Sequence, residues 1–145
     1  MTNFKEELTK NGVIVFTNKG VSMMPLLRHD KDIMVIRAID GEIKKNDAVL
    51  FIRDNGQYIL HRVTKILSGD RYFIIGDNCE SGETVKKEQI IGILTEVKKD
   101  GETIKMTDKS YLRYVRTVPI RRFFFAPYRK AKRLAYKVYK KLFKK

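Results

Sequence analysis

At 145 residues the chain is long enough for one globular domain and a short extension, and its single cysteine, Cys79, excludes an intrachain disulfide framework. The formal net charge is +14, yet residues 111–145 hold thirteen Lys and Arg and no acidic residue, so a nearly neutral body precedes a strongly basic tail. No apolar run reaches the roughly 18 residues of a membrane-spanning helix, and the polar first ten residues lack the apolar stretch of a secretory signal, which predicts a cytoplasmic protein.

The body of the chain has the pattern of a β protein. A short polar helix is predicted over residues 3–10, and Asn11-Gly12 turns the chain into the first β segment. Short runs rich in β-branched and aromatic residues then recur between turn formers, and Asn55-Gly56 marks the clearest hairpin. The predicted strands cover residues 13–16, 33–36, 48–52, 58–63, 72–75 and 90–97. They leave little room for helices, so we expect a mainly β fold, a coiled antiparallel sheet or partial barrel.

After Asp108 the pattern changes to that of a helix. Apolar residues follow one another at helical spacing and share one stripe, with Lys and Arg on the other faces. The stripe consists of Phe124, Tyr128, Ala131, Ala135, Val138 and Leu142. We therefore expect a domain over residues 1–108 and a basic amphipathic helical tail over residues 109–145.

Two polar residues stand out in the β region. Ser22 lies between a flexible Gly20 and a rigid Pro25, just after a predicted strand, in a loop that can hold its hydroxyl exposed at the strand end. Taken alone, the same residues are equally typical of a loop that only turns the chain and packs apolar side chains into the core. His61, on the predicted strand 58–63, is the second signal, because an imidazole can serve as the base that a serine nucleophile needs.

Four motifs occur in an order that resembles the signal peptidase family. They are Gly-x-Ser-Met-x-Pro at residues 20–25, Asp-Ala-Val-Leu-Phe at 47–51, His-Arg-Val at 61–63 and Gly-Asp-Asn at 76–78. The resemblance covers roughly residues 13–97. It implies the coiled sheet of signal peptidases and self-cleaving repressors, and a serine peptidase with Ser22 as nucleophile and His61 as general base.

The base points to one branch of that family. His61 stands where the bacterial branch has Lys, and His is typical of the branch found in the endoplasmic reticulum and archaea. A Lys must have its pKa lowered far below the ordinary value to be neutral at pH 7, whereas a His is largely neutral there already. His29 is interpreted as a solvated turn residue, and Lys65 is offset from the motif. Neither a metal nor a cofactor is expected.

A histidine base usually has an acid that fixes its orientation. The resemblance implies Asp77 or Glu83 for this role, although the family's second acid is Asp where this chain has Glu83, and Glu80 is a weaker candidate. Asp77 can also be read as a turn residue that bonds its own backbone. The motifs further place Met23, Met24, Pro25 and Arg62 at the substrate.

The mode of substrate binding is also implied. An extended peptide is expected to add a strand beside residues 13–16 or 58–61, and backbone N–H groups near Ser22 are expected to hold the oxyanion. By resemblance, the residues just before the cut have small side chains.

The basic tail has three interpretations. An amphipathic helix with aromatic and basic residues fits an anionic membrane surface, and the candidate membrane-binding residues are Phe124, Tyr128, Lys132, Lys137 and Lys141. Nucleic acid is the less favoured partner, because the aromatic residues cluster on one stripe and are not interleaved for base stacking. In the third interpretation the stripe packs on the chain's own sheet.

Together these observations predict a serine endopeptidase that removes a leader or signal-like segment from a peptide or preprotein. We expect it to be cytoplasmic and peripheral at the inner membrane surface. One alternative is a non-catalytic β module whose basic tail binds membrane or nucleic acid. A self-cleaving regulator is another, but no helix-turn-helix precedes the motifs and His replaces Lys.

Overall fold

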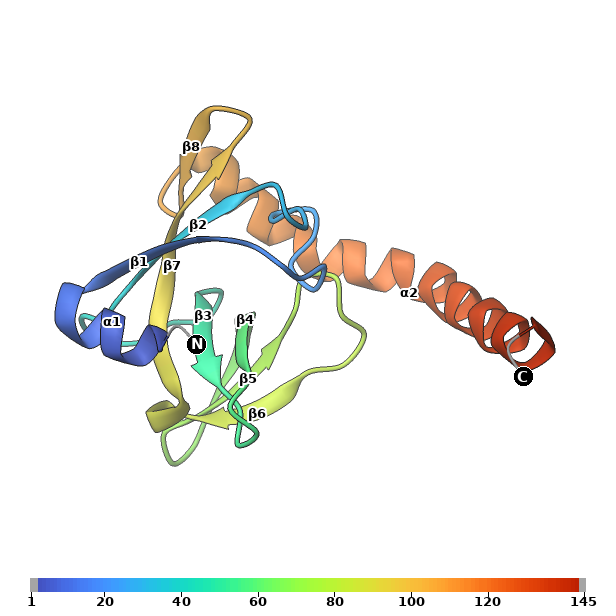
Figure 1. Ribbon diagram of the computed structural model, residues 1–145, viewed down its shortest axis with the longest axis horizontal. Helices are drawn as coiled ribbons and strands as arrows, with labels where there is room; N and C mark the ends of the chain where they lie inside the picture. The colour runs from blue at the N-terminus through green and yellow to red at the C-terminus, as the bar shows by residue number, and fades with distance from the viewer. Residues whose placement is uncertain (1–2, 144–145) are drawn as a thin grey trace.

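The computed structural model describes residues 3–143, so residues 1–2 and the predicted tail residues Lys144 and Lys145 lie outside the described part. An antiparallel sheet of eight strands is followed by one long helix, which runs away from the sheet (Figure 1). The elements are α1 (Phe4–Asn11), β1 (Val13–Thr17), β2 (Ile33–Arg37), β3 (Ala48–Ile52), β4 (Tyr58–Leu67), β5 (Arg71–Ile75), β6 (Glu83–Lys86), the 3-10 helix η1 (Lys87–Gln89), β7 (Ile90–Lys99), β8 (Glu102–Lys105) and α2 (Lys109–Phe143). The predicted mainly β fold with a C-terminal helix is confirmed.

The strands lie in the order β1-β2-β7-β3-β4-β5-β6, and β8 pairs with β7 outside this path. The ten-residue β7 joins the two halves of the sheet, because it pairs with β2 over Ile93 to Lys98 and with β3 over Ile90 to Ile93. At the β7–β8 turn both Asp100 and Gly101 have positive φ angles, 51° and 85°, a combination that Asp and Gly tolerate. The two ends of the path, β1 and β6, leave the sheet open.

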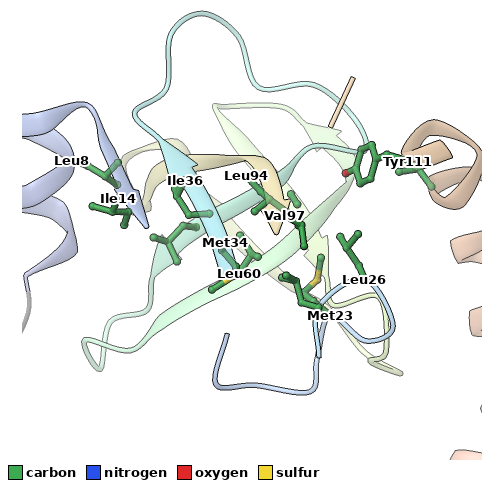
Figure 2. Close-up of a cluster of buried hydrophobic side chains, with 14 residues drawn as sticks. Leu8, Ile14, Met23, Leu26, Met34, Ile36, Leu60, Leu94, Val97 and Tyr111 are labelled. Carbon is green, nitrogen blue, oxygen red and sulfur yellow. The ribbon is translucent and has the colours of Figure 1, made fainter. Parts of the chain in front are cut away.

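Strand β3 is buried on both faces and separates two apolar clusters. Ala48 and Leu50 face the larger cluster, whereas Val49 and Phe51 face the smaller one, as expected for alternating side chains on a strand. In the larger cluster Leu8 of α1, Met23 of the Ser22 loop and Tyr111 of α2 gather around strand residues (Figure 2). The loop that carries Ser22 and the start of α2 are therefore parts of the core.

Helix α2 has two parts with different surroundings, which we call the proximal segment (residues 109–122) and the distal segment (residues 123–143). Tyr111, Val115 and Val118 of the proximal segment are buried at helical spacing. The predicted stripe is on the distal segment and is exposed, with Phe124 at 71 % and Leu142 at 69 %. The interpretation in which this stripe packs on the sheet is therefore wrong, since other residues form the packed face.

Candidate active site

The Ser22 loop connects β1 to β2 and is held at several points. At its base Asn18 N–H donates to Asp32 O over 3.0 Å, and the buried Asp32 carboxylate accepts from Arg28 N–H at 2.8 Å. Met23, 1 % exposed, and Leu27 anchor the loop in the larger apolar cluster. Ser22 itself is half-buried on this anchored loop. The loop thus packs like an apolar plug and also carries the half-buried Ser22.

His61 comes from β4, where its backbone pairs with Val49 of β3 and its side chain is 7 % exposed. Its imidazole approaches Gly76, at the end of β5. A Cβ on Gly76 would lie 3.0 Å from His61 Nε2 and 2.7 Å from the carbonyl oxygen of Ser22. The backbone carbonyl of Ser22 and the imidazole of His61, distant in the sequence, therefore both lie beside Gly76, which has room for them only because it lacks a side chain.

The Gly-Asp-Asn motif also holds the Ser22 loop directly. Asn78 N–H donates to Ser22 O at 2.8 Å, and Asn78 Nδ2 donates to Val21 O at 3.1 Å. Within residues 3–143 no hydrogen bond joins Ser22 Oγ to His61. Catalytic hydrogen bonds are often long in a free enzyme and shorten when substrate binds.

The surroundings of His61 favour its neutral form. Burial lowers the pKa of the imidazole, and the positive charges of Arg53 and Arg122 act in the same direction. The carboxylates of Glu83 and Asp77 oppose this by raising the pKa of His61, but the net shift is downward. These surroundings favour the uncharged imidazole, which is the form that can accept a proton.

Within residues 3–143 the Asp77 carboxylate makes no hydrogen bond to His61, contrary to the predicted orienting role. Its carboxylate accepts from Arg62 Nε at 2.7 Å, from Arg62 Nη2 at 2.6 Å and from Tyr114 Oη at 2.8 Å. Arg62 Nη1 in turn donates to Tyr111 Oη at 2.8 Å. Arg62 is only 2 % exposed, so its predicted contact with substrate is corrected to a structural one with Asp77 and α2.

Glu83 lines the same cleft as His61, but its carboxylate is also bonded to an arginine. It begins β6, its carboxylate forms a two-point ion pair with Arg53, and the bond from Arg53 lowers the pKa of Glu83. The ionised carboxylate lines the same cleft as His61 and acts on it through its charge alone. The third candidate, Glu80, pairs with Arg133 at 3.0 Å. His61 Nδ1 is buried without a hydrogen-bond partner among the described residues.

The remaining predicted site residues fall into two groups. Met23 is a core side chain, so its predicted contact with substrate is wrong, whereas Met24 and Pro25 are exposed and accessible. His29 lies in an exposed turn beside Asp30, as the sequence predicts. Lys65 is exposed beyond an irregularity in β4. His61 is thus the histidine that approaches the Ser22 loop.

A groove of about 790 Å³ runs between β1 and β4 and reaches Ser22. β1 pairs with β2 alone, and residues 58–61 of β4 pair with β3 alone, so each strand has one free edge here. Gly12 and Asn18 are bonded toward β2, and because the ladder alternates, Val15 and Thr17 direct their N–H and C=O groups to the groove. By the same alternation Tyr58 and Leu60 do so from β4.

A second cleft, of about 850 Å³, is lined by His61. Residues 78–83 form one part of its wall, and Arg129, Lys130 and Arg133 of α2 form another. Ser22 lines the first groove and His61 lines the second cleft.

Neither protein-family models nor curated proteins give a significant match to this chain. Among residues 3–143, no group of three or more His, Cys, Asp or Glu side chains is placed to hold a metal ion. The same residues contain no helix with both the length and the apolar character needed to cross a bilayer.

The sequence analysis missed the contribution of α2 to this region. Tyr111 and Tyr114 bond the Arg62–Asp77 pair, and Arg122 Nη2 donates to Gly76 O at 3.3 Å. One signal was present, since Tyr111, Val115, Val118 and Arg122 are separated by steps of four, three and four, which is a second helical stripe.

Proposed function

We propose that this protein is a serine endopeptidase of the signal-peptidase type, which removes a leader or signal-like segment from a peptide or preprotein. Ser22 is the nucleophile and His61 is the general base. The observation that carries the proposal is the meeting of Ser22 O and His61 Nε2 around Gly76. The order of the four motifs and the coiled antiparallel sheet support the same family type.

The proposed reaction proceeds through an acyl-enzyme. Ser22 Oγ attacks the peptide carbonyl carbon while His61 Nε2 takes the hydroxyl proton, and the oxyanion is held by backbone N–H groups. Those of Ser22 and Met23 are suited to this, since they donate to no other group within residues 3–143. His61 then passes the proton to the leaving amine as the C–N bond breaks. Water, deprotonated by His61, cleaves the ester and regenerates Ser22.

The groove between β1 and β4 is the proposed binding site for the segment before the cut. A peptide laid there in extended form can exchange backbone hydrogen bonds with Val15 and Thr17 on one side and with Tyr58 and Leu60 on the other. Met24 and Pro25 are exposed at the Ser22 end. Backbone pairing is independent of side chains, so selectivity requires further contacts, for which small residues before the cut are the expectation from the resemblance.

The distal segment of α2 is proposed to hold the enzyme at an anionic membrane surface, on the cytoplasmic side. Phe124, Tyr128 and Leu142 are exposed apolar groups of the kind that enter a bilayer interface. Lys132, Lys137 and Lys141 accompany them, and each basic residue near an anionic leaflet contributes on the order of 1 kcal/mol. The aromatic residues cluster with the aliphatic ones, which favours membrane over nucleic acid.

One observation favours the rival function, a non-catalytic β module. Asp77 and Glu83 are both bonded to arginines, so no carboxylate bonds His61 Nδ1 among the described residues. A serine peptidase whose histidine has no acid partner still functions as a dyad, but with a less firmly oriented base. Activity measurements on the two proposed catalytic residues separate these functions.

The test is peptide cleavage by the purified full chain, with a peptide library as substrate and mass spectrometry to locate the cuts. Ser22→Ala and His61→Gln should each lower kcat/KM by at least about a thousandfold. Ser68→Ala and His29→Gln are matched controls, because both side chains are exposed, Ser68 at the β4–β5 turn and His29 in the turn beside Asp30, and should leave cleavage unchanged. Cleavage that persists in both Ser22→Ala and His61→Gln would overturn the proposal.

A further inference from the structure

The cleft beside His61 has a basic wall whose residues take no part in the proposed reaction. Arg129 and Lys130 line it from α2, and Arg122 lies next to it, with Nη2 bonded to Gly76 O. The wall also contains Arg53 and Arg133. This concentration of positive charge lies beside the imidazole that would transfer the proton.

Two of these basic residues are neutralised within the protein. Arg53 is paired with Glu83, and Arg133 is paired with Glu80. These two glutamates are the acidic groups that line the cleft, and each already forms an ion pair with an arginine. They leave no carboxylate in the lining for the other basic side chains.

Arg122 and Arg129 have no such partner among the described residues. Arg129 Nη2 donates to the backbone oxygen of Arg122 at 2.9 Å, so each guanidinium bonds a carbonyl rather than a carboxylate. In both residues Nε is buried and makes no hydrogen bond within the described chain. Partly buried guanidinium groups that form no ion pair are suited to receive an anion, and their planar donors match a carboxylate.

We propose that Arg122, Arg129 and Lys130 bind acidic side chains of the substrate in the segment that follows the cut. This inference rests on the proposed function. His61 gives its proton to the leaving amine, so the chain that begins with this amine departs past His61, into the cleft that His61 lines. The groove between β1 and β4 then holds the segment before the cut. The substrate class is a peptide with Asp or Glu among the first residues after the cleaved bond.

Anionic lipid is the other source of negative charge that this wall can meet. The observations favour an acidic peptide, because the basic wall lines a cleft with His61 and residues 78–83 rather than the open face of the distal segment. Exposed apolar side chains, which a bilayer requires, lie on other residues of α2, such as Phe124, Tyr128, Leu134 and Leu142, none of which lines the cleft. The lipid alternative remains an outcome of the test.

The test uses binding as well as cleavage, with the full-length chain. Two labelled peptides share an alanine-rich first half and differ after it, where one has a short run of Asp and the other the same run of Asn. Binding of each is measured by fluorescence anisotropy to Ser22→Ala, which cannot cleave them under the proposed mechanism. We expect the Asp peptide to bind about fivefold more tightly, with a preference that falls as salt is added.

Substitutions in the basic wall test whether it causes the preference for the Asp peptide. Arg129→Gln and Lys130→Gln, each in the Ser22→Ala background, should reduce the preference for Asp toward unity. Lys109→Gln makes the same change of charge at the exposed start of α2, outside the cleft lining, and should leave the preference intact. Circular dichroism confirms that each variant is folded.

The outcomes separate this inference from the proposed function. Equal binding of the Asp and Asn peptides overturns the inference, even if the wild-type chain cleaves the library at Ser22. A preference for Asp that Arg129→Gln and Lys130→Gln abolish supports the inference, even if no peptide is cleaved, in which case the proposed function fails alone. If the two variants lose binding to anionic phosphatidylglycerol vesicles but keep the Asp preference, the wall serves lipid and the inference is overturned.

Discussion

The two segments of α2 have similar side chains but opposite surroundings. The proximal segment buries Val118 to 3 % exposure and directs Tyr111 and Tyr114 onto the Arg62–Asp77 pair. The distal segment leaves Phe123 77 % exposed. Both contain aromatic and basic residues on a helical repeat, yet only one is part of the folded core. Helical spacing shows which residues share a face, whereas contact with the sheet decides which face is covered.

The largest expected effect comes from breaking the buried pair beneath the proximal segment. Asp77→Asn leaves the Arg62 guanidinium buried without its counter-charge, which should lower the free energy of unfolding by about 3–5 kcal/mol. Glu83→Gln is the control, since the Arg53–Glu83 pair is about one-third exposed and should cost about 1 kcal/mol or less. Urea denaturation measures both. If Asp77→Asn and Glu83→Gln lowered the free energy of unfolding equally, the proximal segment would not exclude water from Arg62.

A matched pair of truncations compares the two segments directly. Val115→Ala removes two methyl groups from the core and should cost about 2 kcal/mol, from lost burial and the cavity left behind. Val138→Ala makes the same change on the distal segment, where the side chain is half exposed, and should alter stability by less than about 0.5 kcal/mol. Denaturant unfolding of both variants is the measurement. A cost at Val138 similar to that at Val115 would show that the distal segment is covered in solution.

Membrane affinity should depend on the distal segment instead. Leu142→Ser removes an exposed apolar side chain and should weaken partitioning onto anionic vesicles about tenfold. Leu112→Ser is the control, because Leu112 is also exposed but lies on the proximal segment. Flotation of the full chain with phosphatidylglycerol vesicles gives the partition coefficients. Equal affinity of both variants would argue against the distal segment as the anchor.

The smallest effect is a shift in pH dependence. Burial lowers the pKa of His61, and Arg122 lowers it further against the opposing effect of Glu83, so Arg122→Gln should raise that pKa. In the proposed mechanism the active imidazole is the neutral form, which exists above its pKa, so the acid limb of kcat/KM should move to higher pH in Arg122→Gln. Arg116→Gln, on the exposed side of the same segment, should leave the limb in place. A limb that moves equally in both variants would indicate a general effect of net charge.

The same shift links His61 to stability. The pKa of His61 in the folded chain lies below its unfolded value of about 6.5, so the unfolded chain binds the extra proton between these two pKa values. Stability should therefore be complete above about pH 6.5 and fall as the pH drops through that window. In His61→Gln this part of the pH dependence should disappear from denaturation curves, and its persistence would assign it to another group.

Much of the sheet was predictable because its strands have strong local patterns. The runs that became β1 to β5 and β7 are rich in β-branched and aromatic residues, and each lies between turn formers. Strands β6 and β8 were missed, because each has only four residues and is mostly polar. Backbone pairing with the adjacent strand, β5 for β6 and β7 for β8, stabilises their extended conformation, which their own composition does not predict.

The residues of the candidate site could be proposed from the sequence, but their contacts could not. The motifs directed attention to Ser22, His61 and Asp77, but no local pattern pairs Asp77 with Arg62 or either of them with the tyrosines of α2. These contacts join segments far apart in the sequence, and burial selects them, since a buried guanidinium needs a carboxylate. Local spacing likewise identified an apolar stripe on α2 without showing that it stays uncovered.

The free edges of β1 and β4 have a consequence for the purified protein. Unpaired backbone groups on an outer strand can accept a strand from another copy as readily as a peptide, which is a route to self-association. β1 limits this risk because it has only five residues and is followed by Asn18 and Lys19, whose polar side chains interrupt a continuous template. A peptide bound in the groove would occupy both edges and should therefore also suppress aggregation during concentration.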